Sequence, residues 1–238
     1  DEARATVYNR QETDIVNDVE YIKEIKSPTN QLKVKVKNIF QLQAISELNG
    51  ISAIYYDDVD TYELAKNSYP SLNIIPVLPR IINDKSKSSS ISNNSVVINN
   101  YGDLLKHEGS RIVTDLYMNV ANKHSVYSLC KYNVESITLS PELNRYQIKQ
   151  LINDFNEDYG FIPPLEMVVY GHYQTMIMKH CFINKALNKE KMPCGECKKG
   201  YKLTDRIGKE YPVLGDENCN ITILYYKPVN LFSKVDEL

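Results

Sequence analysis

The sequence predicts an α/β protein with a largely parallel sheet, followed by a small cysteine-rich β tail. Short apolar strands alternate with amphipathic helices up to about residue 180, which is typical of βαβ units. From Tyr201 onward, strand–turn–strand patterns replace this alternation, and four of the five cysteines lie at or after position 181. We therefore expect an α/β domain over residues 1–180 and a cysteine-cluster and β-hairpin tail over 181–238.

The N-terminal segments show both periodicities clearly. Residues 10–26 carry apolar residues on one helical stripe and predict a surface helix (Ile15, Val16, Val19, Ile22 and Ile25). Strict alternation in LKVKVKN predicts a strand whose lysine face, Lys33, Lys35 and Lys37, is exposed to solvent. The following segment, IFQLQAISELNG, predicts a helix that ends at a Gly50 cap.

The same pattern repeats along the chain. Further strands are predicted in AIYYD, IIPVLPRII, RIVTDLYMNVAN, SITLS and LEMVVYG, and helices in VDTYELAKNSYP, SVYSLCKY and NRYQIKQLINDF. The Ser-rich run 83–95 can bury nothing and is interpreted as a mobile loop. This gives about six parallel strands, fewer than a closed eight-stranded barrel of about 250 residues needs. We expect an incomplete or distorted TIM-barrel-like sheet, with the missing strands upstream of Asp1.

Composition bounds the classes of function. The chain has 238 residues, 42% of them hydrophobic and 24% charged, with a formal net charge of −2, so any nucleic-acid contact depends on a local patch. No apolar run is long enough to span a bilayer, so we expect no membrane partner, and no signal peptide is recognisable. An odd number of cysteines disfavours a disulfide framework and favours a reduced, cytoplasmic setting.

Cys181, Cys194, Cys197 and Cys219 are the candidate metal ligands. In the Cys194-Gly195-Glu196-Cys197 turn, two sulfurs can occupy neighbouring vertices of a tetrahedron, with Cys181 and Cys219 supplying the other two. Four thiolates suit Zn²⁺ or an iron–sulfur cluster, and the ligand set does not choose between them. The alternative is four buried or incidental cysteines. Cys130 falls on the apolar face of a helix and is predicted to pack there.

Polar residues at predicted strand ends form a second candidate site. Chemistry in parallel barrels takes place at the carboxyl ends of the strands, where this chain carries a guanidinium, an amide, a carboxylate and an imidazole (Arg80, Asn119, Glu142 and His172). Each has a simpler explanation: an ion pair for Arg80, a loop cap for Asn119, a helix start for Glu142 and an exposed loop for His172. No zinc-protease motif, nucleophile elbow or glycine-rich phosphate loop is present in the sequence.

Several motifs resemble those of the collagenase-like peptidase family U-32. They are IVTDLYMNVAN, ITLSPELNRYQIKQLI, VVYGHYQTMIMKHC, CGECKKGYKLTDRIGKEYPVLGDENC and ILYYKPVNLF, in that order. The resemblance covers Arg111 to Phe232 closely and Leu32 to Ile82 loosely. It implies a TIM-barrel-like core and an iron–sulfur centre, a 4Fe–4S cluster with Zn²⁺ as the alternative, held by the four candidate cysteines.

The resemblance also frames the function. Many members are named peptidases, whereas better-understood relatives act in oxygen-independent hydroxylation of transfer-RNA wobble uridine, ribosomal-RNA cytidine or a quinone precursor, with prephenate linked to the RNA reactions. In larger members another domain interrupts the barrel, so the remainder of the same polypeptide, an upstream barrel half, is an expected partner.

Three hypotheses follow. The first is part of an iron–sulfur enzyme that hydroxylates RNA, and the second is a collagenase-like peptidase. The third is a non-catalytic, zinc-stapled module that binds RNA or completes another domain. Basic residues near the cysteines suit phosphate contacts, although a solvated face is the usual explanation (Lys198, Lys199, Lys202, Arg206 and Lys209).

Overall fold

The computed structural model describes residues 31–81, 94–107, 109–132, 134–189 and 193–237. The predicted helix over 10–26 and nearly all of the predicted loop over 83–95 lie outside these ranges. Within them, the chain has a mixed α/β fold with parallel sheets, as the sequence predicts. None of the described helices is long and apolar enough to cross a membrane.

Seven parallel strands follow one another in chain order. The first sheet runs β1 (Leu32–Val36), β2 (Ile51–Tyr56), β3 (Ile74–Pro76), and the second β4 (Ser95–Ile98), β5 (Arg111–Thr114), β6 (Val134–Thr138), β7 (Leu165–Glu166). The two sheets adjoin where Val77 and Val97 form a parallel bridge and the amide of Leu78 donates to the carbonyl of Val97 at 2.8 Å. The described residues contain no backbone pairing between β7 and β1, so a closed barrel is not confirmed.

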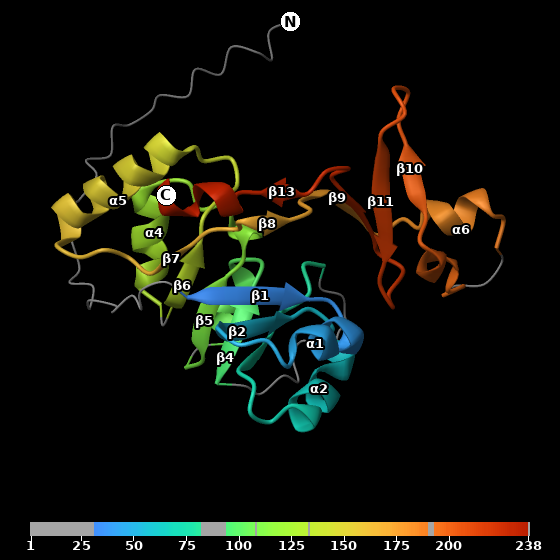
Figure 1. Ribbon diagram of the computed structural model, residues 1–238, viewed down its shortest axis with the longest axis horizontal. Helices are drawn as coiled ribbons and strands as arrows, with labels where there is room; N and C mark the ends of the chain where they lie inside the picture. The colour runs from blue at the N-terminus through green and yellow to red at the C-terminus, as the bar shows by residue number, and fades with distance from the viewer. Residues whose placement is uncertain (1–30, 82–93, 108, 133, 190–192, 238) are drawn as a thin grey trace, which may run out of the picture.

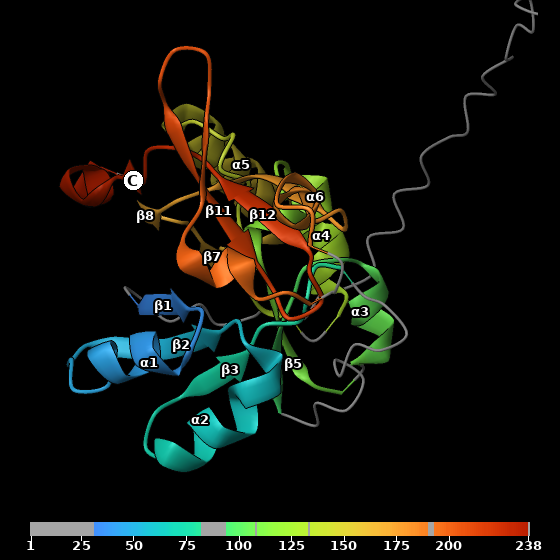
Figure 2. The same cartoon turned by 90° about the vertical axis from the view of Figure 1, so that its right-hand side faces the viewer.

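Helices cover the outer faces of these strands (Figures 1 and 2). Helices α1 (Ile39–Ile45) and α2 (Tyr62–Ser68) bury Leu42, Tyr62 and Ala65 against the first sheet. The second sheet is covered mainly by α4 (Lys123–Cys130) and α5 (Arg145–Tyr159), with α3 (Gly102–Lys106) beside them. Helix α5 begins at an Asn144 capping box and ends at Gly160, whose φ of 78° is left-handed, and its buried residues recur at helical spacing (Ile148, Leu151 and Phe155).

The other face of the strands forms a separate interior. Alternate residues on β2, such as Ala53 and Tyr55, point away from the helices. They pack with residues of β3, β4 and β5 and with the residue that follows β3 (Ile75, Val97, Val113 and Val77). On β1 the alternate residues are the lysines. Lys33 forms an ion pair with Glu166 of β7, and its side chain is only 14% exposed. The predicted solvent-facing lysine face is therefore wrong for Lys33, which is covered and paired with Glu166, whereas Lys35 remains exposed although it forms an ion pair with Asp115.

A separate antiparallel sheet lies to one side of the parallel strands (Figure 1). Its order is β10 (Lys202–Thr204), β11 (Glu210–Gly215), β12 (Ile221–Leu224), β9 (Gln174–Met178), and a short strand β13 (Val229–Asn230) pairs with β8 (Tyr170–Gly171). The predicted hairpin is confirmed: its turn contains Gly208, with φ of 81°, and Asp205 accepts the amides of Ile207 and Lys209. Because β9 belongs to this sheet, the sheet begins before Cys181, and the expected domain division at 180/181 stays a prediction.

Local details differ from the sequence-based expectations. Strand β4 and helix α3 were not predicted, and LEMVVYG divides into β7 and β8. Helix α1 ends at a Ser46 cap, four residues before the expected Gly50. The short strand β4 directly follows a polar run, so its four residues give too little periodicity to be recognised.

Candidate functional site

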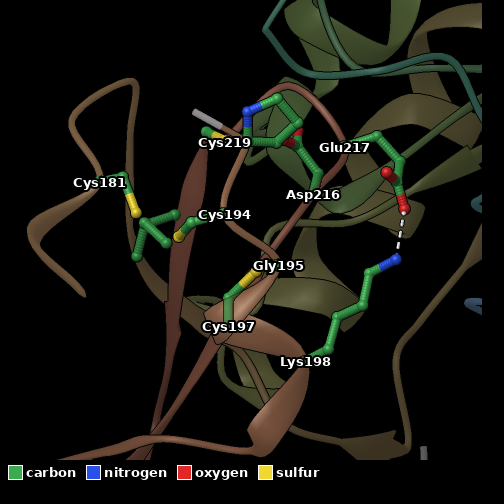
Figure 3. A pocket seen from close by; sticks show the side chains of 10 residues that line it. Cys181, Cys194, Gly195, Cys197, Lys198, Asp216, Glu217 and Cys219 are labelled. Carbon is green, nitrogen blue, oxygen red and sulfur yellow. Dashed lines mark ion pairs between the residues drawn. The ribbon is translucent and has the colours of Figure 1, made fainter. Parts of the chain in front are cut away.

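Four cysteines from three separate segments line one cavity of about 270 Å³ (Figure 3). Cys181 directly precedes the short helix α6 (Phe182–Ala186), and Cys197 lies in the 3₁₀ turn Glu196–Lys199 that follows Cys194. Cys219 belongs to the loop between β11 and β12. The structure thus brings together the four sequence-predicted ligands, all of them free thiols.

Backbone conformation directs these thiols toward the cavity. Gly195 adopts a left-handed conformation with φ of 72°, which folds the chain between Cys194 and Cys197. Cys219 is also left-handed, with φ of 60°, an uncommon conformation for a residue with a side chain. The Asp216 carboxylate holds that loop by accepting the amides of Asn218 and Asn220, at 2.9 and 2.8 Å. A strained non-glycine residue retained at such a position is a feature of functional sites.

Gly215, at the end of β11, packs directly against Cys197. A Cβ atom at position 215 would lie 2.5 Å from the Cys197 sulfur and 2.7 Å from its Cβ. These separations are well below van der Waals contact, so the Cys197 side chain occupies the space that any other residue at 215 would need. The position of this thiol therefore depends on the absence of a side chain at 215.

The electrostatic surroundings reflect the proximity of the thiols. Burial raises the pKa of Cys197 and of Cys219, and the neighbouring thiols, Cys181 among them, raise it further. At the rim of the cavity, Lys198 forms an ion pair with Glu217 at 3.3 Å (Figure 3). A bound metal cation would instead lower the pKa of these thiols, because a metal favours the thiolate form.

The donor set fits a thiolate-bound centre, although it is not preassembled. No group of three or more His, Cys, Asp or Glu side chains within the described ranges is arranged to hold a metal ion. Four thiols around one cavity are nevertheless the ligands that Zn²⁺ and iron–sulfur clusters take. Cys130 is not among them: it is the last residue of α4 and is buried in the core, where burial raises its pKa to about 11, so its predicted packing role is confirmed.

The four polar residues predicted at strand ends, called the rim residues below, lie in three places. The Arg80 guanidinium stacks on the Tyr117 ring at 3.9 Å and donates to the Gln174 side chain at 3.0 Å. Asn119, left-handed with φ of 52°, accepts a hydrogen bond from the Ser140 hydroxyl at 2.7 Å. The same hydroxyl lies 3.4 Å from the amide of Glu142, which joins these two residues. Glu142 does not begin the next helix, since Asn144 is its N-cap.

His172 is separate from the other three. It is exposed in the turn between β8 and β9, and its Nδ1 lies 2.7 Å from the carbonyl oxygen of Tyr225. The four rim residues therefore do not form one group. Arg80 and Asn119 both border the segment after β5, whereas His172 belongs to the antiparallel part of the chain.

Two clusters of charged side chains along the parallel strands were not predicted from the sequence. In the first, Glu166 accepts hydrogen bonds from Lys33, Tyr55 and Ser136. In the second, the Lys35 ammonium lies 2.5 Å from Asp115, which directly follows β5. The signal was available in the lysine alternation and in the aspartate at a strand end, but it was interpreted as a solvent face.

These groups perturb each other strongly. Burial lowers the pKa of Lys35, but the nearby carboxylates of Asp115 and Asp57 outweigh it and hold that pKa above its ordinary value. Burial raises the pKa of Tyr117 to about 12, although Lys35 opposes the shift. Burial, followed by the Glu166 carboxylate, raises the pKa of Tyr55. Both phenols therefore stay protonated near neutral pH and can donate hydrogen bonds.

The basic run near the cysteines is partly neutralised. Lys198 pairs with Glu217, Lys199 with Glu196 at 2.7 Å, and Lys202 with Glu210 at 2.6 Å. Lys209 instead lies over the Tyr226 ring at 4.5 Å. The positive charge left available is therefore concentrated at the β10–β11 turn rather than beside the cysteines.

Comparison with known families matches residues 103–238 to the family described as Peptidase family U32. The matched region includes β5, β6, β7, the antiparallel sheet and all four cavity cysteines. No curated protein and no solved structure matches the chain.

Proposed function

Because the chain belongs to Peptidase family U32, we propose that it is part of an iron–sulfur enzyme that hydroxylates RNA. The observation that carries this proposal is the convergence of four free thiols on one cavity. Four clustered thiols are the ligand set of an iron–sulfur cluster, which supplies the electron transfer that a redox enzyme needs. The match itself does not separate the two activities, so the thiols provide the argument.

Cys181, Cys194, Cys197 and Cys219 would hold the centre, a 4Fe–4S cluster, with Zn²⁺ as the alternative occupant. When bound, an iron–sulfur cluster supplies one-electron transfer. Gly215 and the Asp216 loop would fix two of the ligands. The bonds from amides to ligand sulfurs, such as that from Asn184 to Cys181 at 3.4 Å, would tune the centre.

The carboxyl ends of the parallel strands would bind the substrate, in a barrel-like arrangement. Arg80 presents positive charge there, the Asp115-paired Lys35 lies over the same Tyr117 ring, and the protonated Tyr117 phenol can donate a hydrogen bond to the substrate. Hydroxylation replaces a C–H bond with C–OH: with water as the oxygen source, R–H and H2O give R–OH, two protons and two electrons. This chain would bind and orient the base, while an external redox protein or organic oxidant would take the two electrons.

The remainder of a longer polypeptide would complete the sheet. Strands β1 and β7 are not paired with each other by backbone hydrogen bonds within the described residues, so each has an edge that another strand can pair. The Lys33–Glu166 ion pair already joins their side chains across the interior. In a parallel barrel, side chains from alternate strands likewise share layers in the interior.

One observation favours the peptidase alternative. The Ser136 hydroxyl lies 3.1 Å from the Lys33 ammonium, and serine–lysine pairs act as nucleophile and base in some hydrolases. However, Ser136 is only 5% exposed, so a polypeptide substrate cannot reach it. Lys33 also forms an ion pair with Glu166, so its ammonium is already engaged by another side chain.

The proposed function is tested with the full-length protein in cells of its source. Nucleosides from transfer and ribosomal RNA are compared by mass spectrometry between wild type, a deletion, and the deletion complemented with Cys194→Ala or Cys130→Ala. We expect a nucleoside heavier by one oxygen atom to disappear in the deletion and in Cys194→Ala, and to return with wild type and Cys130→Ala. Unchanged RNA together with gelatin or collagen hydrolysis by the purified protein would establish the peptidase instead.

A further inference from the structure

Three tyrosines cluster at the end of the antiparallel sheet that lies away from the cysteine cavity. Tyr211 is on β11, and Tyr225 and Tyr226 directly follow β12. The ring centroids of Tyr225 and Tyr226 are 4.7 Å apart, and Tyr211 lies 5.6 Å from Tyr226 and 6.2 Å from Tyr225. The cavity cysteines, by contrast, are near Gly215 and Ile221 at the other end of the same strands.

Core packing does not explain the whole cluster. The hydrophobic core of this sheet consists of Val213, Ile221 and Ile223 with surrounding residues, and Tyr211 packs against it. Tyr225 and Tyr226 belong to none of the core clusters of the described chain, and Tyr225 is 40% exposed. Tyr211 therefore anchors two further rings, of which Tyr225 is exposed and Tyr226 is half-buried.

One cation lies over these rings, and two more are close to them in the sequence. The Lys209 ammonium lies 4.5 Å from the Tyr226 ring, and Arg206 and Lys227 are exposed nearby in the sequence. The ion pairs of the described residues include none of these three cations, whereas the neighbouring Lys202 is paired with Glu210. The Asp205 carboxylate is occupied within the turn, where it accepts two amides and the Tyr211 hydroxyl at 3.3 Å.

The cluster adjoins the carboxyl-end rim. The amide of Tyr225 donates to the carbonyl of Tyr173 at 2.7 Å, and His172 contacts the Tyr225 carbonyl. One residue further along, Gln174 pairs with Leu224 in the strand ladder and accepts a hydrogen bond from Arg80. A ligand lying across the tyrosines can therefore extend toward Arg80 and Tyr117.

We propose that Tyr225 and Tyr226, supported by Tyr211 and Lys209, form a stacking platform for unpaired bases of single-stranded RNA. This rests on the proposed function and deepens it by assigning the surface that takes the RNA. Aromatic faces stack on bases of any sequence, and single-stranded regions are where unstacked bases are available. Arg206 and Lys227, both exposed and close in the sequence to the platform residues, contact the backbone phosphates.

The test is a binding measurement on the metal-loaded, full-length protein. Fluorescence anisotropy is recorded with labelled single-stranded oligouridine and with an RNA duplex of the same length. We expect Tyr225→Ala and Tyr226→Ala each to weaken oligouridine binding about five- to 150-fold, the range for loss of one stacked base. Tyr225→Phe should bind like wild type because it keeps the ring. Tyr146→Ala, which removes a 79% exposed tyrosine on α5, is the matched control and should change nothing.

A charge variant separates stacking from phosphate contact. Lys227→Gln should weaken binding modestly and reduce the slope of log affinity against log salt by about 0.7, the value for one phosphate contact on a single strand. The tyrosine variants should leave that slope unchanged. Tyr225→Leu, which removes the aromatic face but keeps an apolar side chain, carries the test if Tyr225→Ala does not fold, as judged by circular dichroism and iron content.

The outcomes distinguish the platform from the function. If wild type binds oligouridine and both tyrosine variants bind equally well, the platform is wrong while RNA hydroxylation stands. Equal affinity for duplex and single strand would also overturn stacking. If wild type binds no RNA at low salt, the RNA assignment and the platform fail together, whatever the metal content.

Discussion

Replacing Gly215 with alanine should displace Cys197 and weaken the metal centre. The added methyl group would lie 2.5 Å from the Cys197 sulfur and 2.7 Å from its Cβ. Carbon and sulfur atoms in contact need at least about 3.5 Å, so one of the two must move by roughly 1 Å. The φ of Gly215 is not left-handed, so backbone strain does not contribute, and the effect comes from this contact alone.

The magnitude follows from overpacking. Forcing an extra methyl group into a filled site costs about 1–3 kcal/mol of unfolding free energy. Displacement of one ligand should reduce metal affinity about 10–100-fold, the range seen when groups that support ligands are altered. Both effects should occur together, because the same contact produces them.

Thermal unfolding and metal content measure these two effects. Gly102→Ala is the matched control, since its Cβ would lie 3.2 Å from the Asn100 side chain and its helical site tolerates alanine. We expect Gly102→Ala to retain wild-type metal content and Gly215→Ala to lose most of it during chelator challenge. A Gly215→Ala protein with wild-type stability and metal retention would refute the packing argument.

Three further changes probe the interior and a helix end. Glu166→Ala should lower the unfolding free energy by about 3 kcal/mol, because it leaves the Lys33 ammonium and the Tyr55 hydroxyl without their acceptor. A Lys33→Met/Glu166→Leu double variant removes both charges and should be more stable than Glu166→Ala in urea denaturation; equal stability would contradict this reason. The pKa of Lys35 is raised in the folded state, so its contribution to stability should be complete below a pH of about 10.4 and decline as the pH rises further. The difference in unfolding free energy between wild type and Lys35→Met should therefore shrink when denaturation is measured at increasing alkaline pH. A constant difference would count against the ion pair. Asn144→Ala should cost about 1 kcal/mol by removing the capping box of α5, whereas Asn218→Ala, at an exposed loop position whose side chain caps no helix, should cost less in the same assay.

The sequence predicted the elements that depend on local periodicity. Helix α5 has its N-cap, apolar stripe and terminal glycine within one continuous segment, so its position could be inferred directly. Strand β4 could not, because four residues after a polar run carry almost no periodic signal. The existence of β1 was also clear, but alternation identifies two faces of a strand without saying what covers each. Lys33 faces inward because Glu166, distant in the sequence, lies opposite it, and the exposed Lys35 is paired with Asp115, which spacing along the chain does not indicate either.

The candidate sites were likewise predictable where they depend on local sequence and not where they depend on distant residues. The Cys194–Cys197 turn follows from spacing and a glycine, and the grouping of Cys181 and Cys219 with it around one cavity agrees with the predicted set. The rim residues were less predictable, because side chains at strand ends depend on loop conformation. His172, for example, contacts the Tyr225 carbonyl, a partner that no spacing rule indicates.

Metal analysis of protein purified without oxygen and without chelators tests the thiol centre most directly. Iron, sulfide and zinc are quantified, and visible absorption is recorded, for wild type, Cys194→Ala, Cys219→Ala and Cys130→Ala. We expect near-stoichiometric iron–sulfur content and a brown colour in wild type and Cys130→Ala, and loss of both in the two cavity variants; colourless protein with stoichiometric zinc would favour the zinc-stapled module instead. Metal-free wild-type protein, or full metal content in Cys194→Ala and Cys219→Ala, would show that the four thiols do not share a metal centre.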